Sequence, residues 1–246
     1  MNFLGLRTLS ALTVALVAAG FAMVFFFAPL DADQGFIQKI FYLHVPLAIS
    51  ALIGFMVAAY YAVRHLRSGD SKWDFRSYVA IHISVIFGVA VLVTGAIWAR
   101  ASWGKWFVWE EPTLVSFLIV FLLYCTYYPL RYAIEDRERQ ARYASVFAVT
   151  AGAFVPLNFI AVRLAETLVH PRVFATADGG LPPKMWITFL VCMVAIWALW
   201  TCLVRFELAA KSASARLSRL RRALEGDDRL VGGSRIAPAA PRAGAG

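Results

Sequence analysis

Aromatic side chains are concentrated in one short segment of this chain of 246 residues. Four of the eight tryptophans (Trp98, Trp103, Trp106 and Trp109) fall within a single short stretch that also contains Phe107. Tryptophan is common where a membrane meets water, because its ring is apolar and its indole N–H needs a polar partner. An ordinary interfacial belt does not gather so many in one loop. The concentration therefore predicts a flat apolar surface on which a large planar ligand, such as a porphyrin, could lie.

His44 is the first of two histidines that could bind the iron of such a ligand. It shares one predicted helix face with the apolar residues that precede it, which are Phe36, Ile37, Ile40 and Phe41. Pro46 suits the first turn of a helix, where its missing N–H would have no partner in any case. A single histidine of this kind would more often be a satisfied structural residue than a ligand.

His170 changes that balance because it repeats the arrangement at the end of another apolar run. The sequence NFIAVRLAETLVHPR predicts a helix that continues as far as His170, with Arg163 and Glu166 on the same face. Pro171 then disfavours helical geometry at His170 itself. Neutral imidazole is a usual protein ligand of haem iron, and two imidazoles give a six-coordinate, b-type arrangement. We therefore predict that His44 and His170 are the axial ligands of a haem.

The tryptophan-rich segment would have to present its rings to that haem. A helix through it would place Trp103, Trp106, Phe107 and Glu110 on one face, and Gly104 would allow a close approach of the backbone. The porphyrin ring could stack on the indoles, while basic side chains neutralise its propionates at the wet edge. The candidates for that neutralising role are Arg100, Lys105, Arg163 and Arg172.

Two adjacent acids, Glu110 and Glu111, end the segment immediately before Pro112. Carboxylates stabilise the N-terminus of a helix through its dipole, and proline suits the first helical turn. Capping of the next helix is therefore the simpler interpretation of these acids. A direct contact with haem or with a partner protein is the alternative.

The remaining histidines fit a haem site poorly. His65 lies between Arg64 and Arg67 at the other end of an apolar run, and His82 lies just inside the next run. Most of the bilayer would separate both of them from His44, so neither could share an iron with it. They could pair with each other, which a membrane electron carrier with a second haem would require. We expect both to be structural.

The elements that must position these residues are membrane helices. Hydrophobic residues make up 61% of the chain and charged residues 16%, and the mean hydropathy is +0.67, so the chain must be solvated by lipid. A spanning helix needs about 20 apolar residues. Six charge-free windows meet that need: 8–30, 40–63, 77–99, 112–130, 143–162 and 185–204. We predict an all-α polytopic membrane protein with six transmembrane helices, the first of them uncleaved, and short outer amphipathic segments.

Lysine and arginine set the predicted orientation, because cytoplasmic loops carry the excess of basic residues. The N-terminus, the loops after the second and fourth spans, and the tail from Arg205 together hold 18 of the 24 basic residues. Both termini are therefore predicted to be cytoplasmic, and residues 31–45, 100–112 and 163–184 to face the outside. The net charge of +9 follows from this bias and does not indicate nucleic-acid binding.

The predicted domains are a membrane domain, 1–206, and a basic cytoplasmic tail, 207–246. The membrane domain includes the tryptophan-rich outer segment 98–112. Leucines and arginines between Leu208 and Leu224 fall at roughly helical spacing, which is compatible with a short helix on anionic lipid or with a solvated tail of no specific role. We expect disorder from Gly226 onwards. The three cysteines lie in predicted spans without a CxxC pair, so no disulfide framework or thiol redox centre is indicated.

At these residues the chain resembles the haem exporter protein C (CcmC) family of cytochrome c maturation system I, one of the tryptophan-rich (WWD) haem-handling proteins. The family pattern, approximately WGxWWxWD, is matched by Trp103, Gly104, Trp106, Phe107, Trp109 and Glu110. Phe107 replaces a tryptophan of the pattern, and Glu110 replaces its aspartate. The sequences around His44 and His170 also resemble the two histidine sites of the family. Pro112 stands where many relatives carry an arginine.

The resemblance covers nearly the whole chain except the tail, and it implies a function. Family members bind haem at the outer face of the bacterial inner membrane and present it to a haem chaperone, CcmE, which attaches it covalently. They act with CcmA, CcmB and CcmD in an ABC-type complex. For this chain the resemblance implies transient, non-covalent binding of haem b. No GxxxxGK[ST] phosphate loop is present, so ATP hydrolysis would come from a partner, and we expect a haem-transfer protein rather than an enzyme.

Three other classes stay open at this point. A membrane electron carrier would use a second haem at His65 and His82. A subunit of a cytochrome c synthase shares the tryptophan motif but usually has more spans and further histidines. A structural permease subunit would carry its tryptophans as an interfacial belt and retain no haem.

Overall fold

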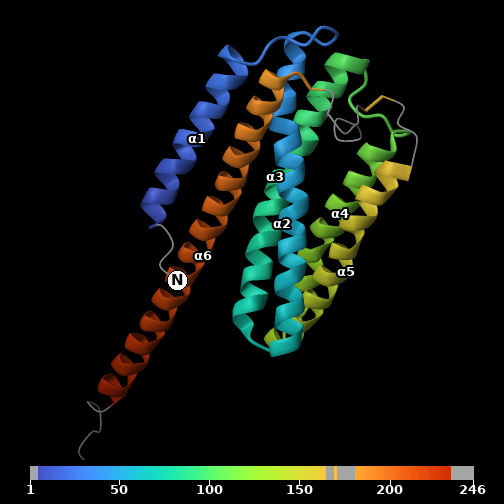
Figure 1. Ribbon diagram of the computed structural model, residues 1–246. Helices are drawn as coiled ribbons and strands as arrows, with labels where there is room; N and C mark the ends of the chain where they lie inside the picture. Colours follow the sequence, from blue (N-terminus) through green and yellow to red (C-terminus); the bar gives the residue numbers. More distant parts are fainter. Residues whose placement is uncertain (1–4, 165–168, 171–180, 234–246) are drawn as a thin grey trace, which may run out of the picture. The chain divides into compact units, whose positions relative to one another are not determined.

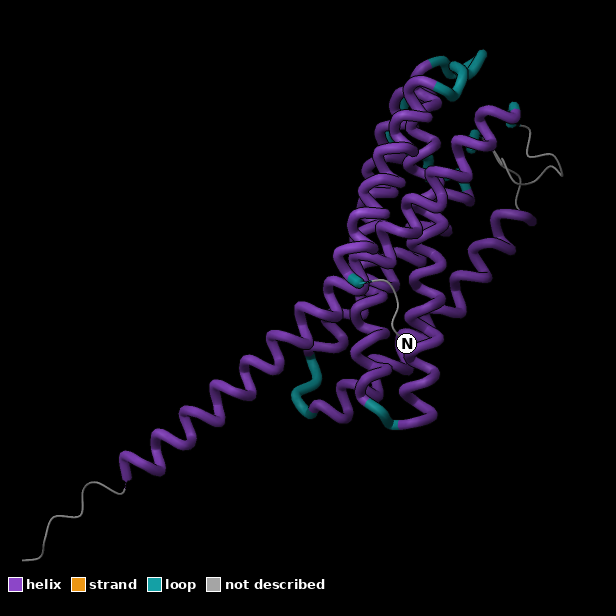
Figure 2. Tube along the Cα trace, turned by 60° about the vertical axis from the view of Figure 1, so that its left-hand side comes forward, coloured by secondary structure: helices purple, strands orange, loops and turns teal. Residues whose placement is uncertain are grey.

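Six helices that are long and apolar enough to cross a membrane make up this computed structural model, which describes residues 5–164, 169–170 and 181–233. They are α1 (Leu6–Phe26), α2 (Phe41–Ser68), α3 (Ser71–Trp103), α4 (Pro112–Tyr132), α5 (Arg137–Leu164) and α6 (Pro183–Gly233). A short 3₁₀ helix, η1 (Phe36–Ile40), leads into α2. Figures 1 and 2 show helices joined by short loops, and the described residues form no strand. The predicted all-α fold with six spans is confirmed.

The chain forms two compact units, Met1–Arg205 and Phe206–Gly246. The first contains α1 to α5, η1 and the beginning of α6, and it holds every residue of the candidate site. Within this unit, the connections from α1 to α2 and from α3 to α4 lie at one end, which is uppermost in Figure 1 and is here named the upper end. The turns from α2 to α3 and from α4 to α5 lie at the opposite, lower end.

The second span begins close to its predicted position, since the window 40–63 starts just before α2 at Phe41, and η1 extends the helical segment back to Phe36. The backbone N–H of Phe41 bonds to the carbonyls of Gln38 and Lys39, so η1 passes directly into α2. Burial drives this extension, since Phe41 and Tyr42 are each only 2% exposed. Pro46 therefore lies beyond the first turn of α2, and its predicted place in that turn is wrong. His44 lies in the first turn instead.

The helix predicted through the tryptophan-rich segment is also wrong. The third helix stops at Trp103, and Gly104 adopts a left-handed conformation with φ of 73°. Its N–H bonds to the carbonyl of Arg100, which is a usual helix C-cap of glycine. A Cβ at Gly104 would meet nothing within 4 Å. Glycine is therefore favoured here by its left-handed backbone conformation and not, as predicted, by a close approach of the backbone to another group.

The fifth helix ends before the point that the periodicity predicts. It stops at Leu164, and Val169 and His170 lie in a bend. The backbone N–H groups of Val169 and His170 donate to the carboxylate of Glu111. His170 is thus held by a contact with another part of the chain. Glu166 lies outside the described residues.

Small residues bring the central helices close together. The second helix packs against α3 and α5, and α4 packs against α5. A Cβ built on Gly152 of α5 would lie 2.5 Å from the Cβ of Ala59 in α2. Beside that contact the rings of Phe55 and Tyr124 stack with centroids 3.9 Å apart. Lipid gives no hydrophobic drive between helices, so close packing of this kind holds a membrane bundle together.

Polar contacts at the helix ends complete the bundle. The Nζ atom of Lys39 donates to the carbonyls of Val24 (2.6 Å) and Ala28 (2.9 Å), which caps the end of α1. At the lower end, Arg131 of α4 forms a two-pronged ion pair with Asp74 of α3, with both N–O distances 2.7 Å.

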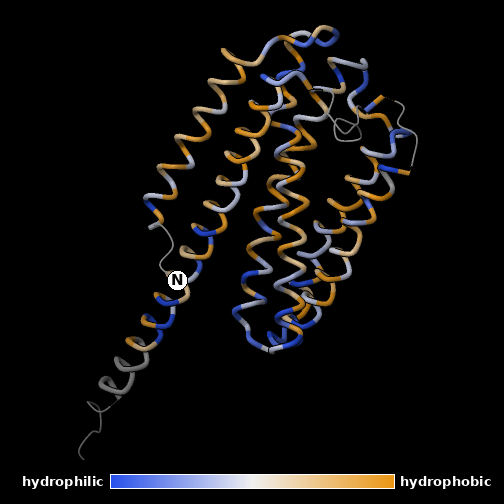
Figure 3. Tube along the Cα trace, viewed as in Figure 1, coloured by the Kyte–Doolittle hydropathy of each residue, from blue (hydrophilic) through white to orange (hydrophobic). Residues whose placement is uncertain are grey.

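Figure 3 shows apolar residues along the helices and hydrophilic residues at the lower ends of α2 and α3. Asp70 caps α3 there, and its hydrogen bonds from Lys72 lower the pKa of its carboxyl.

Candidate functional site

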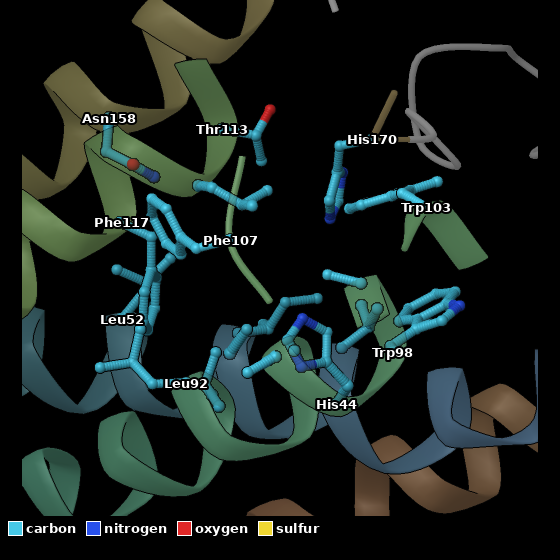
Figure 4. Close-up of a pocket in the computed structure, with 18 of the residues that line it drawn as sticks. His44, Leu52, Leu92, Trp98, Trp103, Phe107, Thr113, Phe117, Asn158 and His170 are labelled. Atoms are coloured by element: carbon cyan, nitrogen blue, oxygen red, sulfur yellow. The ribbon is translucent and has the colours of Figure 1, made fainter. Parts of the chain in front are cut away.

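A cavity of about 400 Å³ opens near the upper end of the first unit. Its walls come from α2, α3, α4, α5 and the tryptophan-rich segment, and they are mostly apolar (Figure 4). The size and character match a small-molecule site. Seven of the residues that the sequence singles out line it: His44, Trp98, Trp103, Trp106, Phe107, Arg163 and His170.

The two histidines approach the cavity from opposite walls. His44 comes from the first turn of α2, and His170 comes from the bend after α5. In Figure 4 their imidazole rings point toward each other across the cavity. Residues far apart in the sequence are thus placed as two ligands of one iron would need to be.

A hydrogen bond from α3 determines which nitrogen of His44 is available. The Nδ1 atom lies 2.9 Å from Oγ1 of Thr94. The Thr94 hydroxyl has one hydrogen, and it donates that hydrogen to the backbone carbonyl of Ala90 (2.7 Å) or Val91 (3.2 Å). With its hydrogen donated there, its oxygen accepts from Nδ1–H of His44. The Nε2 atom keeps its lone pair and can bind a metal, and a hydrogen-bonded partner on the other ring nitrogen is the usual support for such a ligand.

The absence of a side chain at Gly95 makes room for the His44 ring. A Cβ built there would lie 2.8 Å from Cε1 of His44, well inside normal contact distance. On another side the ring meets Trp98 edge-on, with centroids 5.8 Å apart. The Nε1 atom of Trp98 donates to Oε1 of Gln34 at 2.7 Å, which fixes the indole.

His170 has a tryptophan partner of its own. The rings of Trp103 and His170 lie at an interplanar angle of 61° with centroids 6.4 Å apart. Trp103 is the last residue of α3 and Trp98 lies about one turn before it, so one helix places a tryptophan against each histidine. The backbone of His170 is held by Glu111, as described above.

The aromatic segment after α3 divides between the cavity and the surface. Trp106 and Phe107 line the cavity, although Trp106 is also 62% exposed. Trp109 is 69% exposed and packs on Phe107 with centroids 4.6 Å apart. Neither Trp109 nor the exposed Glu110 lines the cavity. The structure thus brings only part of the predicted aromatic platform to the cavity.

Three of the four predicted propionate partners lie in the described residues, and of these three only Arg163 lines the cavity. Arg100 lies over the ring of Trp106, 5.9 Å from its centroid, and donates to the carbonyl of Gly104. Lys105 is exposed outside the cavity lining. Arg172 lies outside the described residues.

His65 and His82 have surroundings of a different kind. The Nδ1 atom of His65 lies 2.8 Å from the hydroxyl of Ser145, and both side chains are buried between α2 and α5. His82 lies among tyrosines, with its ring beside Tyr78 and Tyr128. Neither histidine lines the cavity.

Sequence reasoning missed Thr94, Gly95 and the buried role of Glu111. Thr94 and Gly95 are small residues inside an apolar span, where a polar hydroxyl usually finds an internal partner. That signal was available in the sequence, but it does not say which side chain the partner is. Only the packing of α2 against α3 places both residues at His44.

Comparison with known proteins identifies the family of this chain. The family model for CcmC, described as "Heme exporter protein C", matches residues 4–223. A protein of that name from Rhodobacter capsulatus is 34% identical over 218 residues, which cover 85% of this chain and 87% of the relative. The Escherichia coli (strain K12) protein is 30% identical over 74% of this chain and 75% of its own. The one from Haemophilus influenzae is 28% identical over 83% and 84%, respectively. The chain therefore belongs to the heme exporter protein C family.

Proposed function

We propose that this membrane protein binds haem in the cavity at its upper end and passes it to a haem chaperone during cytochrome c maturation. His44 and His170 are the axial ligands in this proposal. The observation that carries it is that these imidazoles face each other across one apolar cavity. The hydrogen bond to Thr94 supports it, because it directs the lone pair of His44 to Nε2. The name of the family and of its relatives, which refers to haem export, supports the same cargo.

The protein's own part in this function is to position haem and exclude water. Trp98 and Trp103 restrict the two imidazoles. Trp106 and Phe107 give apolar surface to the porphyrin ring, and Arg163, which lines the cavity, is the partner of a propionate. Gly104 ends α3 so that these aromatic residues can turn toward the cavity.

The exposed residues beside the cavity are suited to a receiving protein. Trp109 and Glu110 are exposed next to Phe107, and we assign them to contact with the chaperone. Arg100, Lys105 and Arg172 are the other cations of these segments that could neutralise propionates or guide a partner.

The orientation and partners follow from the charge pattern and the family. The basic loops belong to the cytoplasmic side of the bacterial inner membrane, so the upper end faces the periplasm. The chaperone is CcmE, and the protein acts with CcmA, CcmB and CcmD, of which a partner hydrolyses ATP. The cargo is haem b, held without a covalent bond so that it can leave.

The test of this function is haem loading of the chaperone in cells that produce the full complex. The protein carrying His44→Ala and His170→Ala together is compared with wild type, and covalent haem on CcmE is measured by its absorption after purification. The proposal expects loading to fall to background while both membrane proteins remain present. Unchanged loading would show that the two histidines have no part in delivery.

A Gly95→Ala substitution gives a steric test of the His44 position. The new Cβ would lie 2.8 Å from Cε1 of His44, so the ring must leave its place against Thr94. Alanine is a better helix former than glycine, so lower helix propensity cannot explain the result. We expect haem affinity to fall at least about tenfold, as loss of a ligand's hydrogen-bond partner does in metal sites. Haem titration of the purified protein measures it.

The matched control is Gly20→Ala in α1. A Cβ there would lie 3.4 Å from Sγ of Cys192, an ordinary contact, and Gly20 does not line the cavity. This variant should bind haem as wild type does. Equal affinity for the Gly95→Ala and Gly20→Ala variants would contradict the assigned position of His44.

A further inference from the structure

Glu111 is a carboxylate in an unusual environment. It is 0% exposed, although it belongs to a loop at the end of the bundle. Burial of a charged group is unfavourable unless hydrogen bonds replace its water. The neighbouring acid, Glu110, is exposed. The two adjacent acids, which look equivalent in the sequence, therefore have different surroundings.

The hydrogen bonds of Glu111 join two separate parts of the chain. Its Oε1 atom lies 3.5 Å from the backbone N of Thr113 in the first turn of α4. Its Oε2 atom accepts from the backbone N–H groups of Val169 (2.9 Å) and His170 (3.2 Å). The shorter distances are those to the bend that carries His170. Hydrogen bonds to a charged acceptor are stronger and more directional than neutral ones.

These contacts exceed what a helix cap alone requires. A cap needs only an acceptor for the first N–H groups of its own helix. Here one carboxylate oxygen accepts from the bend that follows α5 in the sequence, at the residue whose ring faces His44. His44 has a side-chain partner in Thr94. For His170, the hydrogen bond found at Glu111 is to the backbone.

We propose that Glu111 is a positioning residue for His170: by binding the backbone N–H groups of Val169 and His170, it fixes the imidazole at the distance and direction that an axial ligand needs. This inference rests on the proposed function, since His170 must be a ligand for its position to matter. Glu111 itself does not line the cavity. It joins the start of α4 to the second ligand, so the wall of the cavity and the ligand are set together.

The first part of the test does not depend on haem. Hydrogen exchange is measured by mass spectrometry on the full-length protein in detergent, for wild type, Glu111→Gln and Glu111→Ala. The amides of Val169 and His170 should exchange faster in Glu111→Ala and to a smaller extent in Glu111→Gln, which keeps one carbonyl acceptor. Glu135→Gln, an exposed acid in the loop before α5, is the matched control and should leave exchange unchanged. Unaltered exchange at Val169 and His170 in Glu111→Ala would overturn the proposal.

The second part uses the haem spectrum, which a purely structural cap would not alter. The ferric spectrum of the Glu111→Ala variant should show partial loss of six-coordinate haem, as is expected for His170→Ala, and free imidazole should restore it by replacing the displaced ligand. Glu111→Gln should lie between wild type and Glu111→Ala. Faster exchange with a wild-type spectrum would make Glu111 a structural residue only and overturn its positioning role.

The two parts keep the proposals distinguishable. If wild type retains no haem, the proposed function fails, while the exchange result still decides whether Glu111 holds the bend. Circular dichroism and size-exclusion chromatography establish that each variant is folded before it is compared. If Glu111→Ala does not fold, the comparison of Glu111→Gln with Glu135→Gln decides, because the amide has the same shape as the carboxyl group and retains one acceptor oxygen.

Discussion

Replacing His44 or His170 with alanine is expected to remove the six-coordinate spectrum of the haem-bound protein. Each imidazole enters the cavity from a different wall, so each variant loses one axial ligand and keeps the other. The iron then becomes five-coordinate or takes water, and its absorption bands change. Haem affinity should fall by at least about tenfold, since removing only the hydrogen-bond partner of a metal ligand already lowers affinity by about that factor. Absorption spectra of the purified variants measure both effects.

The other histidines give the control and separate the rival function. The structure places His65 against Ser145 and His82 among tyrosines, away from the cavity. His65→Ala and His82→Ala should therefore keep the wild-type spectrum. If these variants lost haem while His44→Ala and His170→Ala retained it, the protein would fit a membrane electron carrier. A wild-type protein that retains no haem at all would fit a structural permease subunit.

Loss of Arg131 should have the largest effect on stability. Its guanidinium binds both carboxylate oxygens of Asp74 at 2.7 Å, and the two side chains are only 12% and 10% exposed. The hydroxyl of Tyr127 also accepts from Arg131 at 3.0 Å. Arg131→Gln would leave the carboxylate of Asp74 buried without its ion-pair partner. Removing one partner of a buried pair costs about 3–5 kcal/mol. Thermal or detergent unfolding followed by circular dichroism measures the loss.

Two further variants test the cause of that loss. Arg131→Gln combined with Asp74→Asn leaves no unpaired charge, so it should recover part of the stability that the single variant loses. Glu207→Gln breaks the more exposed pair with Lys211 in α6 and should cost only about 0.3–0.5 kcal/mol. A double variant as unstable as Arg131→Gln alone would show that the stranded carboxylate is not the cause.

The helices and the two histidines that line the cavity could be predicted because their signals are local in the sequence. Long charge-free windows identify membrane spans without knowledge of their packing. His44 stood out because it lies near the start of such a window, two residues before a proline, and His170 because it follows another window and directly precedes a proline. Residues of the WGxWWxWD pattern that line the cavity (Trp103, Trp106 and Phe107) were also found in this way.

Errors arose where backbone conformation or distant contacts override periodicity. A glycine can end a helix by adopting a positive φ, as Gly104 does. The spacing of the aromatic residues on either side of Gly104 does not show where the helix ends. Likewise, the prediction that Arg163 and His170 share one face requires a continuous helix between them. The structure places His170 in a bend, where its backbone N–H donates to Glu111. The sequence pattern also directs attention to Glu110, while burial distinguishes Glu111. Partners such as Thr94 are defined only once α2 and α3 are packed together.

The central claim is that one haem lies between His44 and His170, and its ligands can be counted directly. The wild-type protein is produced with ¹⁵N-labelled histidine, purified with haem, and examined in the ferric state by pulsed electron paramagnetic resonance. We predict couplings from two axial histidine nitrogens on a single low-spin haem. A spectrum with one axial histidine nitrogen, or with none, would contradict the assignment of both imidazoles as ligands.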